Sequence, residues 1–546
     1  MSNFNIVDNA DTRFNTLKKG FNLRWPDGNG GADYIYICNS AQAVTDAAND
    51  ALAKGCRITV RSGGHCYEGF VANKLAADGD QPLAIIDLSE MKGMLYDEEG
   101  TVTSPYDPSV GYKFSLSTGN QNWDGYNSLY KGANRTIPGG SCYSVGAGGH
   151  ITGGGYGLLS RLHGLTVDWL SAVDILVPNS SGTALVAKHV SLNSTGSDRD
   201  LFIACRGAGG GNFGIVLNYY FKELPAAPQT AYLLTLTYPW SSFASQAQFD
   251  NFMRAYWQWF EDNDANWNSN DPSLANGGLF TLLKVQHRAT GDIKLAIQYT
   301  GMDGTVGGAQ DAPFIDFVNT MNKAAGFTPT VSEEAGWRGP MTQAFRDAHR
   351  LQDPVRDARL MDWLYVTQTL NGSGENQRGK YKSAYQKGQF GPQELDTLWR
   401  RLNDTQETRL TQMLVQFDSY GGCINTNDET RNPTSVYQRS SLIKSQFQVY
   451  WTNAGDDRFY IDWMRTFYSE YFADCGGKPY ENQTYEGCYI NYPDVDMKYT
   501  DEAGTMIDPQ WLALYYGDKA AMLQATKAAV DSTNIFHFEL SIPVAK

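Results

Sequence analysis

The first 224 residues alternate short apolar runs with turns, and this pattern predicts strands with a few helices between them. Apolar residues at helical spacing over residues 41–54 predict a helix that Ser40 can cap and Gly55 can end. Residues 171–178 and 183–190 flank a turn at 179–182 and predict a hairpin. Further runs rich in apolar and β-branched residues predict strands at 57–60, 82–89 and 215–221.

From about Pro225 the pattern changes to longer strands that alternate with longer helices. Strands are predicted at residues 231–240, 279–287, 292–300, 363–370 and 410–420. Helices are predicted at residues 245–263, 310–325, 391–403, 456–474 and about 517–531. Strands separated by helices and short turns indicate an α+β fold, in which an antiparallel sheet carries helices on one face.

The length of 546 residues exceeds the size at which a single core keeps growing, so we expect two domains. Residues 1–224 are expected to form the first domain, and residues 225–475 a substrate-binding domain. The stretch 476–546 lacks partners of its own, so we expect it to return to the first domain and complete it.

Charge and hydropathy narrow the range of partners. The net charge of −15 disfavours nucleic acid and anionic membranes. No run of about 18 apolar residues could span a membrane. The N-terminal residues lack a basic start followed by an apolar core, so no secretory signal is visible and a cytoplasmic location is favoured. The pattern does not decide the oligomeric state.

The eight cysteines do not form a disulfide framework for a chain of this length, and no CxxC pair suggests structural zinc. Cys475 and Cys488 could pair in an oxidising compartment, and two unrelated free thiols are equally compatible with their positions.

A glycine-rich stretch at residues 139–157, reading GGSCYSVGAGGHITGGGYG, organises the first domain. Nine of its residues are glycine, and such density is costly in a helix or strand because glycine loses the most backbone freedom on ordering. Loops of this kind let backbone N–H groups approach a phosphate or pyrophosphate closely. A flexible linker is the alternative, but the interspersed Cys, Tyr, Val and Ile residues favour burial.

A second glycine cluster places Gly209, Gly211 and Gly214 at the spacing of the GxGxxG dinucleotide fingerprint. That fingerprint requires a strand before it and a helix after it. Here a strand is predicted to follow, so we reject a nicotinamide-binding unit. The glycines can still line a pyrophosphate by a different backbone route.

His65 and Cys142 each lie in a glycine-rich turn, where their side chains can point into whatever the backbone surrounds. The alternatives are an ordinary loop histidine and a buried, inert thiol. A metal site would combine them with Cys66 and His150, but the irregular spacing and the lack of carboxylates argue against it, so no metal is expected.

Five segments together carry a family resemblance. RSGGHCYEGF (61–70), the 139–157 stretch, RGAGGGNFGIV (206–216), YGGCIN (420–425) and YINYPDVD (489–496) resemble the berberine bridge enzyme-like flavoproteins of the vanillyl-alcohol oxidase superfamily. The motifs are most similar to those of sugar-oxidising members, including hexose and oligosaccharide oxidases. The resemblance implies an FAD domain formed by both chain ends and an inserted antiparallel-sheet substrate domain.

The resemblance also implies how FAD would be held. His65 matches the histidine bonded to the flavin 8α-methyl group, and Cys142 matches the cysteine bonded to C6, which implies bicovalent FAD. Cys66 departs from the more frequent serine or aspartate. The other residues expected to bind the cofactor are Arg61, Ser62, Gly63, Gly64, Val145, Gly146, Gly148, Gly149, His150, Gly153, Gly154, Gly155, Gly157, Gly211, Gly214, Ile215 and Asn491.

The catalytic base is expected among tyrosines. Tyr492 matches the family's catalytic tyrosine, Tyr420 a second active-site tyrosine in some relatives, and Tyr489 stands beside them in the motif YINY. A tyrosine with a pKa of about 10 is a poor base unless its phenolate is stabilised. The alternative makes Tyr489 and Tyr492 ordinary strand residues. Candidates to support the phenolate or contact substrate are Arg378, Lys380 and Lys382, although a solvated basic face explains them equally well.

Two features bear on the acceptor and the substrate. Val145 matches the position beside the flavin that controls oxygen access, and valine resembles the oxidase type. Large rings in the second domain could stack on sugar faces, although the helix at 245–263 places most of them at core spacing. These rings are Tyr256, Trp257, Trp259 and Trp363.

Taken together, these features predict an FAD-dependent oxidase that removes hydride from a hydroxyl-bearing carbon of a saccharide or glycosylated metabolite and forms hydrogen peroxide from dioxygen. Tyr492 would be the base and Tyr420 its assistant. An oxidative ring-closing enzyme of natural-product biosynthesis is the alternative, and a flavin-bearing binding protein without turnover is a third reading.

Overall fold

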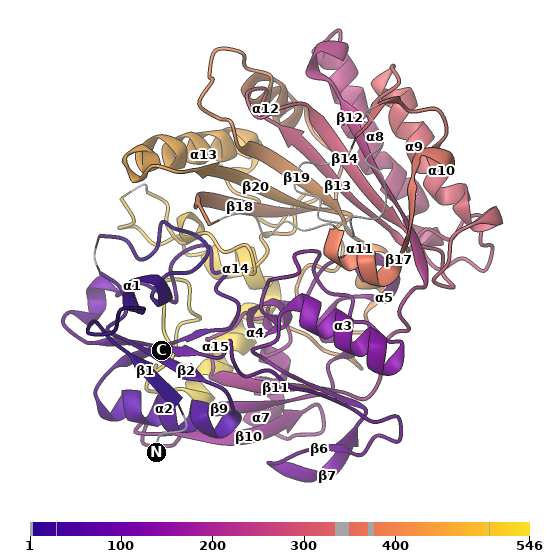
Figure 1. Ribbon diagram of the computed structural model, residues 1–546. Coiled ribbons are helices and arrows are strands. Elements are labelled where there is room, and N and C mark those ends of the chain that lie inside the picture. Colours follow the sequence, from indigo (N-terminus) through magenta and orange to yellow (C-terminus); the bar gives the residue numbers. More distant parts are fainter. Residues whose placement is uncertain (1–3, 29, 333–348, 370–375, 502, 546) are drawn as a thin grey trace.

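The computed structural model describes residues 4–28, 30–332, 349–369, 376–501 and 503–545. Its elements form a lower part built around two sheets and an upper part built around one larger sheet (Figure 1). Both ends of the chain lie in the lower part, and the middle of the chain forms the upper part.

The first lower sheet has the strand order β1 (Phe4–Val7), β2 (Tyr34–Cys38), β4 (Leu83–Asp87) and β3 (Arg57–Arg61). Helix α2 (Ala41–Ala53) packs against it and confirms the predicted helix. The Ser40 hydroxyl accepts a hydrogen bond from the Ala43 N–H, which is the expected N-terminal cap. Gly55 closes the helix with a φ of +74°, a conformation that favours glycine.

The second lower sheet has the order β10 (Leu185–Ser191), β9 (Ala172–Pro178), β11 (Ile215–Phe221), β8 (Phe114–Ser117) and β5 (Met94–Tyr96). Strands β9 and β10 form the predicted hairpin. Strand β11 follows the second glycine cluster directly, so the rejection of a nicotinamide fingerprint is confirmed. A separate two-stranded ribbon joins β6 (Val102–Ser104) to β7 (Asp107–Tyr112).

The helices of the lower part come from both ends of the chain. They are α1 (Phe14–Leu17), α3 (Asn122–Ala133), α4 (Ala147–Thr152), α5 (Ser160–His163), α6 (Thr166–Trp169), α7 (Ser197–Ala204), α14 (Trp511–Tyr516) and α15 (Ala520–Val530). Helix α15 packs on α7, and the Lys527 ammonium donates to the Asn212 carbonyl at 2.6 Å. We therefore propose that residues 1–224 and 476–546 form one domain and that residues 225–475 form the other.

Nine described strands form the sheet of the upper part. The order is β16 (His349–Arg350), β15 (Thr330–Val331), β12 (Thr230–Tyr238), β14 (Ile293–Tyr299), β13 (Leu279–Gln286), β19 (Met413–Ser419), β20 (Ile443–Trp451) and β18 (Arg378–Gln386), with β17 (Arg359–Asp362) beside β12. Every pairing in it is antiparallel, as the sequence predicts.

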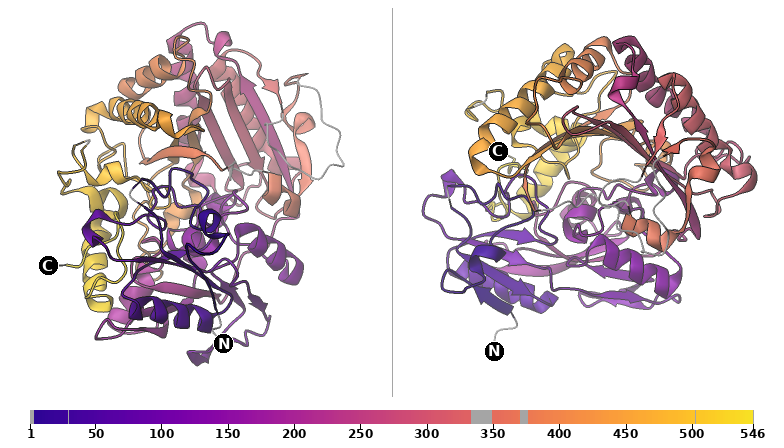
Figure 2. Two further views of the ribbon diagram at one scale, coloured as in Figure 1. Left: turned by 60° about the vertical axis from the view of Figure 1, so that its left-hand side comes forward. Right: turned by 45° about the horizontal axis from the view of Figure 1, so that its top comes forward.

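Helices cover the outer face of this sheet. They are α8 (Gln246–Asn263), α9 (Ala312–Ala325), α12 (Pro392–Leu402) and α13 (Asp457–Tyr471), while the short α10 (Pro354–Asp357) lies near α9. Figure 2 shows them outside the sheet in both views, so the inner face turns toward the lower part. Tyr256, Trp257 and Trp259 of α8 are buried in the core, which leaves the alternative of sugar stacking without support.

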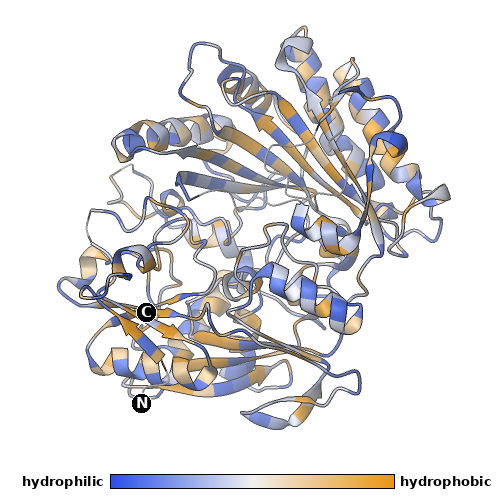
Figure 3. Ribbon diagram, viewed as in Figure 1, coloured by the Kyte–Doolittle hydropathy of each residue, from blue (hydrophilic) through white to orange (hydrophobic). Residues whose placement is uncertain are grey.

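The two faces of the upper sheet differ in polarity. Figure 3 shows hydrophilic and hydrophobic residues in alternation along several of them. Apart from Lys380 and Lys382 of β18, the face under the helices is mainly apolar, whereas the inner face carries many buried polar side chains, among them Asp418, Lys444, Gln446 and Gln448. A sheet that is covered on both sides but polar on one indicates that the polar face meets a ligand.

Two parts of the secondary-structure prediction are wrong. Residues 363–369 form helix α11 (Trp363–Thr369) instead of a strand, and Trp363, Val366 and Thr367 are buried at helical spacing. Short apolar runs do not separate the two states by themselves. Strands β18 and β20 were not predicted, because polar residues interrupt the apolar pattern by which strands are recognised.

Two further predictions concern a possible Cys475–Cys488 disulfide and membrane-spanning helices. All eight cysteines are free thiols, and the Cys475 thiol donates to the carbonyls of Phe472 and Lys478 instead of bonding Cys488. Of the helices in the described chain, none has the length and apolar character needed to cross a membrane.

Candidate active site

A cavity of about 390 Å³ lies between the glycine-rich loops of the lower part and the inner face of the upper sheet. Segments far apart in the chain meet around it. His65 and Cys142 come from two different loops, Gly211 comes from the second glycine cluster, Gln446 comes from β20, and Tyr492 comes from the C-terminal segment.

The loops that hold His65 and Cys142 touch through their main chains. A Cβ on Gly63 would lie 2.2 Å from the backbone nitrogen of Gly146, so no side chain fits between these loops. At Gly149, which lines the cavity, a Cβ would meet no protein atom within 4 Å. Glycine thus serves two purposes here: close contact between loops, and a bare backbone surface facing the cavity.

Asn122 supplies an unpaired polar atom to the same wall. Its amide nitrogen donates to the Cys142 carbonyl at 3.1 Å. Its carbonyl oxygen is buried, and no residue that the structure describes donates a hydrogen bond to it. A buried acceptor without a partner is costly, so this oxygen suits a hydroxyl or N–H group of a bound cofactor.

His65 is fixed in a defined position. Its ring stacks on Phe21 with centroids 3.8 Å apart, and its Nε2 lies 3.2 Å from the Ser144 hydroxyl. Burial lowers the pKa of His65 to about 4, so the imidazole is neutral near pH 7. A neutral imidazole has a nitrogen lone pair available for bonding.

Cys142 lines the same cavity as His65. Ser144, two residues after Cys142, reaches the His65 ring, so the two loops present both side chains to one cavity. The loop is held from behind, because the Gly140 N–H donates to Nε2 of His150 at 2.9 Å. Burial lowers the pKa of His150 to about 4, which keeps that nitrogen an acceptor. The bare glycine wall, the Asn122 oxygen and these two side chains fit a flavin nucleotide.

Tyr492 faces this wall together with a buried ion pair. The Lys444 ammonium donates to the Tyr492 hydroxyl at 3.1 Å and forms an ion pair with Asp418 at 2.7 Å. Lys444 is fully buried, and desolvation lowers its pKa although Asp418 acts in the opposite direction. Burial, followed by the Asp418 charge, raises the pKa of Tyr492 well above its usual value.

Tyr489 and Asn491 belong to the same C-terminal segment as Tyr492 and also line the cavity. The Asn491 amide donates to the His150 carbonyl at 2.9 Å and to the Tyr489 hydroxyl at 3.1 Å. Burial raises the pKa of Tyr489 to about 12, against the lowering effect of Asn491. Neither tyrosine lies in a strand, so the alternative that treats them as ordinary strand residues is wrong.

Comparisons with known proteins place this geometry in a family. The model of the family "Berberine and berberine like" matches residues 488–543. Hexose oxidase from Chondrus crispus is 35% identical over 561 residues, which cover 99% of this chain and 95% of that protein. The chain belongs to the berberine bridge enzyme-like family. The resemblance predicted from the motifs is therefore confirmed.

Other members of the berberine bridge enzyme-like family agree with this assignment. Aclacinomycin-N/aclacinomycin-A oxidase from Streptomyces galilaeus is 34% identical, with 98% of this chain and 89% of that protein covered. A solved glycopeptide hexose oxidase complexed with teicoplanin has a TM-score of 0.79 and 30% identity, with 99% of this chain and 98% of that chain covered. The protein is an FAD-linked oxidase, and the predicted two-domain α+β fold is confirmed.

Most residues expected to bind the cofactor line the cavity of this berberine bridge enzyme-like protein. They are Arg61, Ser62, Gly63, Gly64, His65, Cys142, Val145, Gly146, Gly148, Gly149, His150, Gly157, Gly211, Gly214 and Asn491. The Arg61 guanidinium donates to the Asp87 carboxylate and to the Leu17 and Lys19 carbonyls. These contacts already use the charge of Arg61.

Four expected residues lie away from the cavity lining of the described chain. Gly153 packs against Asn491, and a Cβ there would lie 2.0 Å from the Asn491 side-chain oxygen. Gly154 and Gly155 adopt φ values of +120° and +75° in the turn after α4. Ile215 is fully buried in the core of the lower part. The three glycines shape the loop and Ile215 packs in the core, so none of the four lines the cavity.

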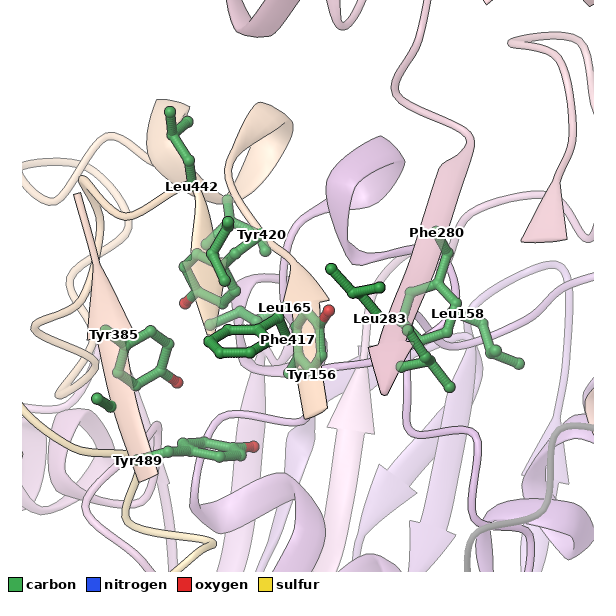
Figure 4. Packing of buried hydrophobic residues seen from close by; sticks show 14 of the residues in the cluster. Tyr156, Leu158, Leu165, Phe280, Leu283, Tyr385, Phe417, Tyr420, Leu442 and Tyr489 are labelled. Carbon is green, nitrogen blue, oxygen red and sulfur yellow. The ribbon is translucent and has the colours of Figure 1, made fainter. Parts of the chain in front are cut away.

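Tyr420 is also outside the cavity lining. Its hydroxyl donates to the Gln438 carbonyl at 3.0 Å, and its ring packs 5.4 Å from Tyr156 and 5.0 Å from Tyr385. Figure 4 shows it within a buried group that includes Leu165 and Phe417. The geometry does not support the expected role of Tyr420 as an assistant to the base.

In the part of the chain that the structure describes, no basic residue of β18 forms a hydrogen bond with the Tyr492 hydroxyl. Lys380 and Lys382 are buried in ion pairs with Asp494, and Arg378 pairs with Asp457. The expectation of a solvated basic face is therefore wrong for the two lysines. The cation beside Tyr492 is Lys444, which sequence reasoning missed because β20 was not predicted.

Proposed function

We propose that this protein oxidises a hydroxyl-bearing carbon of a saccharide or of a glycosylated metabolite, with dioxygen as acceptor and hydrogen peroxide as product. The relatives named hexose oxidase and glycopeptide hexose oxidase support a sugar substrate. Val145, which lines the cavity, supports an oxidase-type access route for oxygen. The observation that carries the proposal is a row of amide side chains on the wall shared with Tyr492.

This amide row consists of Gln416, Gln446 and Gln448, with Asp418 and Tyr450 at its ends. Gln416 donates to Asp418 at 2.8 Å, Gln448 donates to Gln446 at 2.9 Å, and Tyr450 donates to Gln448 at 2.8 Å. Gln416 and Gln446 face each other across β19 and β20. All five residues line the cavity.

The amide row suits a polyhydroxylated ligand. Each amide has two N–H donors and two acceptor lone pairs, and each sugar hydroxyl both donates and accepts. The contacts within the row use only part of this capacity and fix the orientation of each amide. A cavity for a purely aromatic substrate would instead expose apolar side chains at these positions.

The proposed roles follow from position. His65 and Cys142 would tether FAD, which supplies the hydride acceptor and passes the electrons to dioxygen. Asn122 and the glycine wall would hold the cofactor in one orientation. The amide row would orient the sugar, and Tyr492 would remove the hydroxyl proton of the carbon that is oxidised.

The charges around Tyr492 determine whether it can act as a base. Its raised pKa favours the neutral phenol. The Lys444 ammonium is within hydrogen-bond distance of the hydroxyl and stabilises a phenolate there. Asp418 offsets part of the desolvation that lowers the pKa of Lys444, so the three residues form one proton-holding unit whose titration is shared.

The substitution Lys444→Met tests this unit. Loss of the ammonium removes the donor to the phenolate, so the pKa of Tyr492 rises further and the base form requires a higher pH. We expect the pH profile of substrate-driven flavin reduction to move upward by about one pH unit or more. Lys18→Met, at another lysine of the cavity lining, is the matched control and should leave the profile in place. An unchanged profile in Lys444→Met would contradict the assignment.

The substrate proposal is tested by peroxide detection across monosaccharides, oligosaccharides, glycosylated metabolites and non-glycosylated phenols. We expect peroxide from sugar-bearing compounds. Gln446→Leu should lower kcat/KM for them about tenfold or more, because it leaves sugar hydroxyls unpaired. Gln393→Leu on the outer helix α12 is the control and should have no effect. Peroxide or flavin bleaching from phenols alone would favour a ring-closing enzyme.

A further inference from the structure

A cluster of five charged residues, four of them buried, lies outside the cavity at the edge strand β18. It consists of Glu68, Lys380, Lys382, Asp494 and Asp496. Lys380 contacts Glu68 and Asp494 at 2.6 Å each, and Lys382 contacts Asp494 at 2.6 Å and Asp496 at 2.8 Å. The side chains of Glu68, Lys380 and Asp494 are each only 1% exposed.

The acidic and basic side chains of this cluster stabilise each other's charged forms. Burial favours the neutral form of Lys380, but Asp494, Asp496 and Glu68 outweigh it and raise the pKa of this lysine, so it stays charged. Arg465 of α13 adds a further cation, 2.7 Å from Asp496. Buried ion clusters contribute little net stability compared with apolar packing of the same volume, and their best-supported use is to specify one arrangement.

The cluster connects two segments that line the active-site cavity, those of His65 and Tyr492, through strand β18. Glu68 lies three residues after His65, Asp494 lies two residues after Tyr492, and both are bound to the single side chain of Lys380. The proposed cofactor tether and the proposed base are therefore connected through one ammonium group on a strand of the upper sheet.

A stack of tyrosines repeats this connection on the cavity side. The ring of Tyr67 lies 3.7 Å from that of Tyr381 at an angle of 9°, and 5.9 Å from that of Tyr492. Tyr67 precedes Glu68, and Tyr381 stands between Lys380 and Lys382. Side chains alternate across a strand, so Tyr381 points to the inner face while the two lysines point to the other.

We propose that this charge cluster is a positioning device that sets the placement of Tyr492 relative to the His65 loop, and thereby sets the rate of substrate oxidation. Glu68, Lys380 and Asp494 are positioning residues in this scheme because they touch neither substrate nor cofactor. The proposal rests on the role of Tyr492 as base. A displacement of about 1 Å at a reacting group can lower a rate about a hundredfold, so a small shift of this segment is sufficient.

Glu68→Gln and Lys380→Met test the proposal in the full-length flavin-loaded protein. Each is made in the natural chain and in Tyr492→Phe, and anaerobic flavin reduction by the best sugar is measured. In the natural chain we expect each to slow reduction about 10- to 100-fold while the covalent flavin remains. In the Tyr492→Phe background we expect no further slowing, because the residue that the cluster positions has lost its function.

The outcomes separate positioning from general damage. An equal slowing in both backgrounds, or full speed in the natural chain, would overturn the proposal. Asp168→Asn disrupts the Arg439–Asp168 ion pair, which is mostly shielded from solvent but not adjacent to Tyr492 in sequence, and should leave the reduction rate unchanged. Glu68→Gln keeps side-chain volume and leaves Lys380 paired with Asp494, so it remains measurable if Lys380→Met does not fold. If Tyr492→Phe alone reduces flavin at full speed, the function of Tyr492 fails instead.

Discussion

Replacement of Tyr492 by phenylalanine is expected to slow substrate-driven flavin reduction about 10²- to 10⁴-fold, the usual contribution of a positioned acid–base group. The flavin should stay bound, because Tyr492 contributes neither of the proposed tethers. The loss follows from the geometry: Tyr492 lines the cavity and its hydroxyl receives a hydrogen bond from Lys444, and phenylalanine removes this hydroxyl.

Anaerobic rapid-mixing measurements of flavin bleaching test this prediction directly. Tyr420→Phe is the control: its hydroxyl donates to the Gln438 carbonyl in the buried core, so its removal should cost stability and leave reduction unchanged. Unchanged bleaching in Tyr492→Phe would remove Tyr492 from the mechanism. A strong loss in Tyr420→Phe would restore the role that the sequence first indicated for Tyr420.

The two tethers should behave independently. Cys142→Ala is expected to retain flavin bound through His65, and His65→Ala is expected to retain flavin bound through Cys142. The double variant should release all of its flavin on acid precipitation. The physical reason is that a different residue contacts each position: Phe21 stacks on the His65 ring, whereas Asn122 donates to the Cys142 carbonyl.

The measurement is the visible absorbance of the acid-precipitated pellet compared with its supernatant. Cys66→Ala is the matched control, since Cys66 also lines the cavity and follows His65 directly. It should leave the flavin in the pellet. Complete loss of flavin in either single tether variant would show that one bond depends on the other, and flavin retained in the double variant would show that another residue forms a bond.

Local features of the fold were predictable because each depends on a few neighbouring residues. The cap at Ser40 and the hairpin of β9 and β10 follow from residue types at short spacing, and both are present. The cavity positions of His65 and Cys142 also follow from local sequence, since both lie in glycine-rich loops that must approach a ligand.

The ion pair beside Tyr492 was not predictable by the same reasoning. Asp418 and Lys444 come together because β19 pairs with β20 in one register, and Tyr492 joins them from a segment 48 residues after Lys444. Strands β18 and β20 alternate polar and apolar residues, which is the usual pattern of a solvated face. Only the position of the lower part against the sheet shows that these polar residues are buried.

The direct contact between the backbones of Gly63 and Gly146 makes the gap between the two tether loops a fixed dimension of the molecule. Side chains can change rotamer and so adjust a distance, but two peptide planes pressed together cannot. The spacing of the loops that carry His65 and Cys142 is therefore set by backbone packing, and we expect variation in substrate range to come from the opposite wall of the cavity.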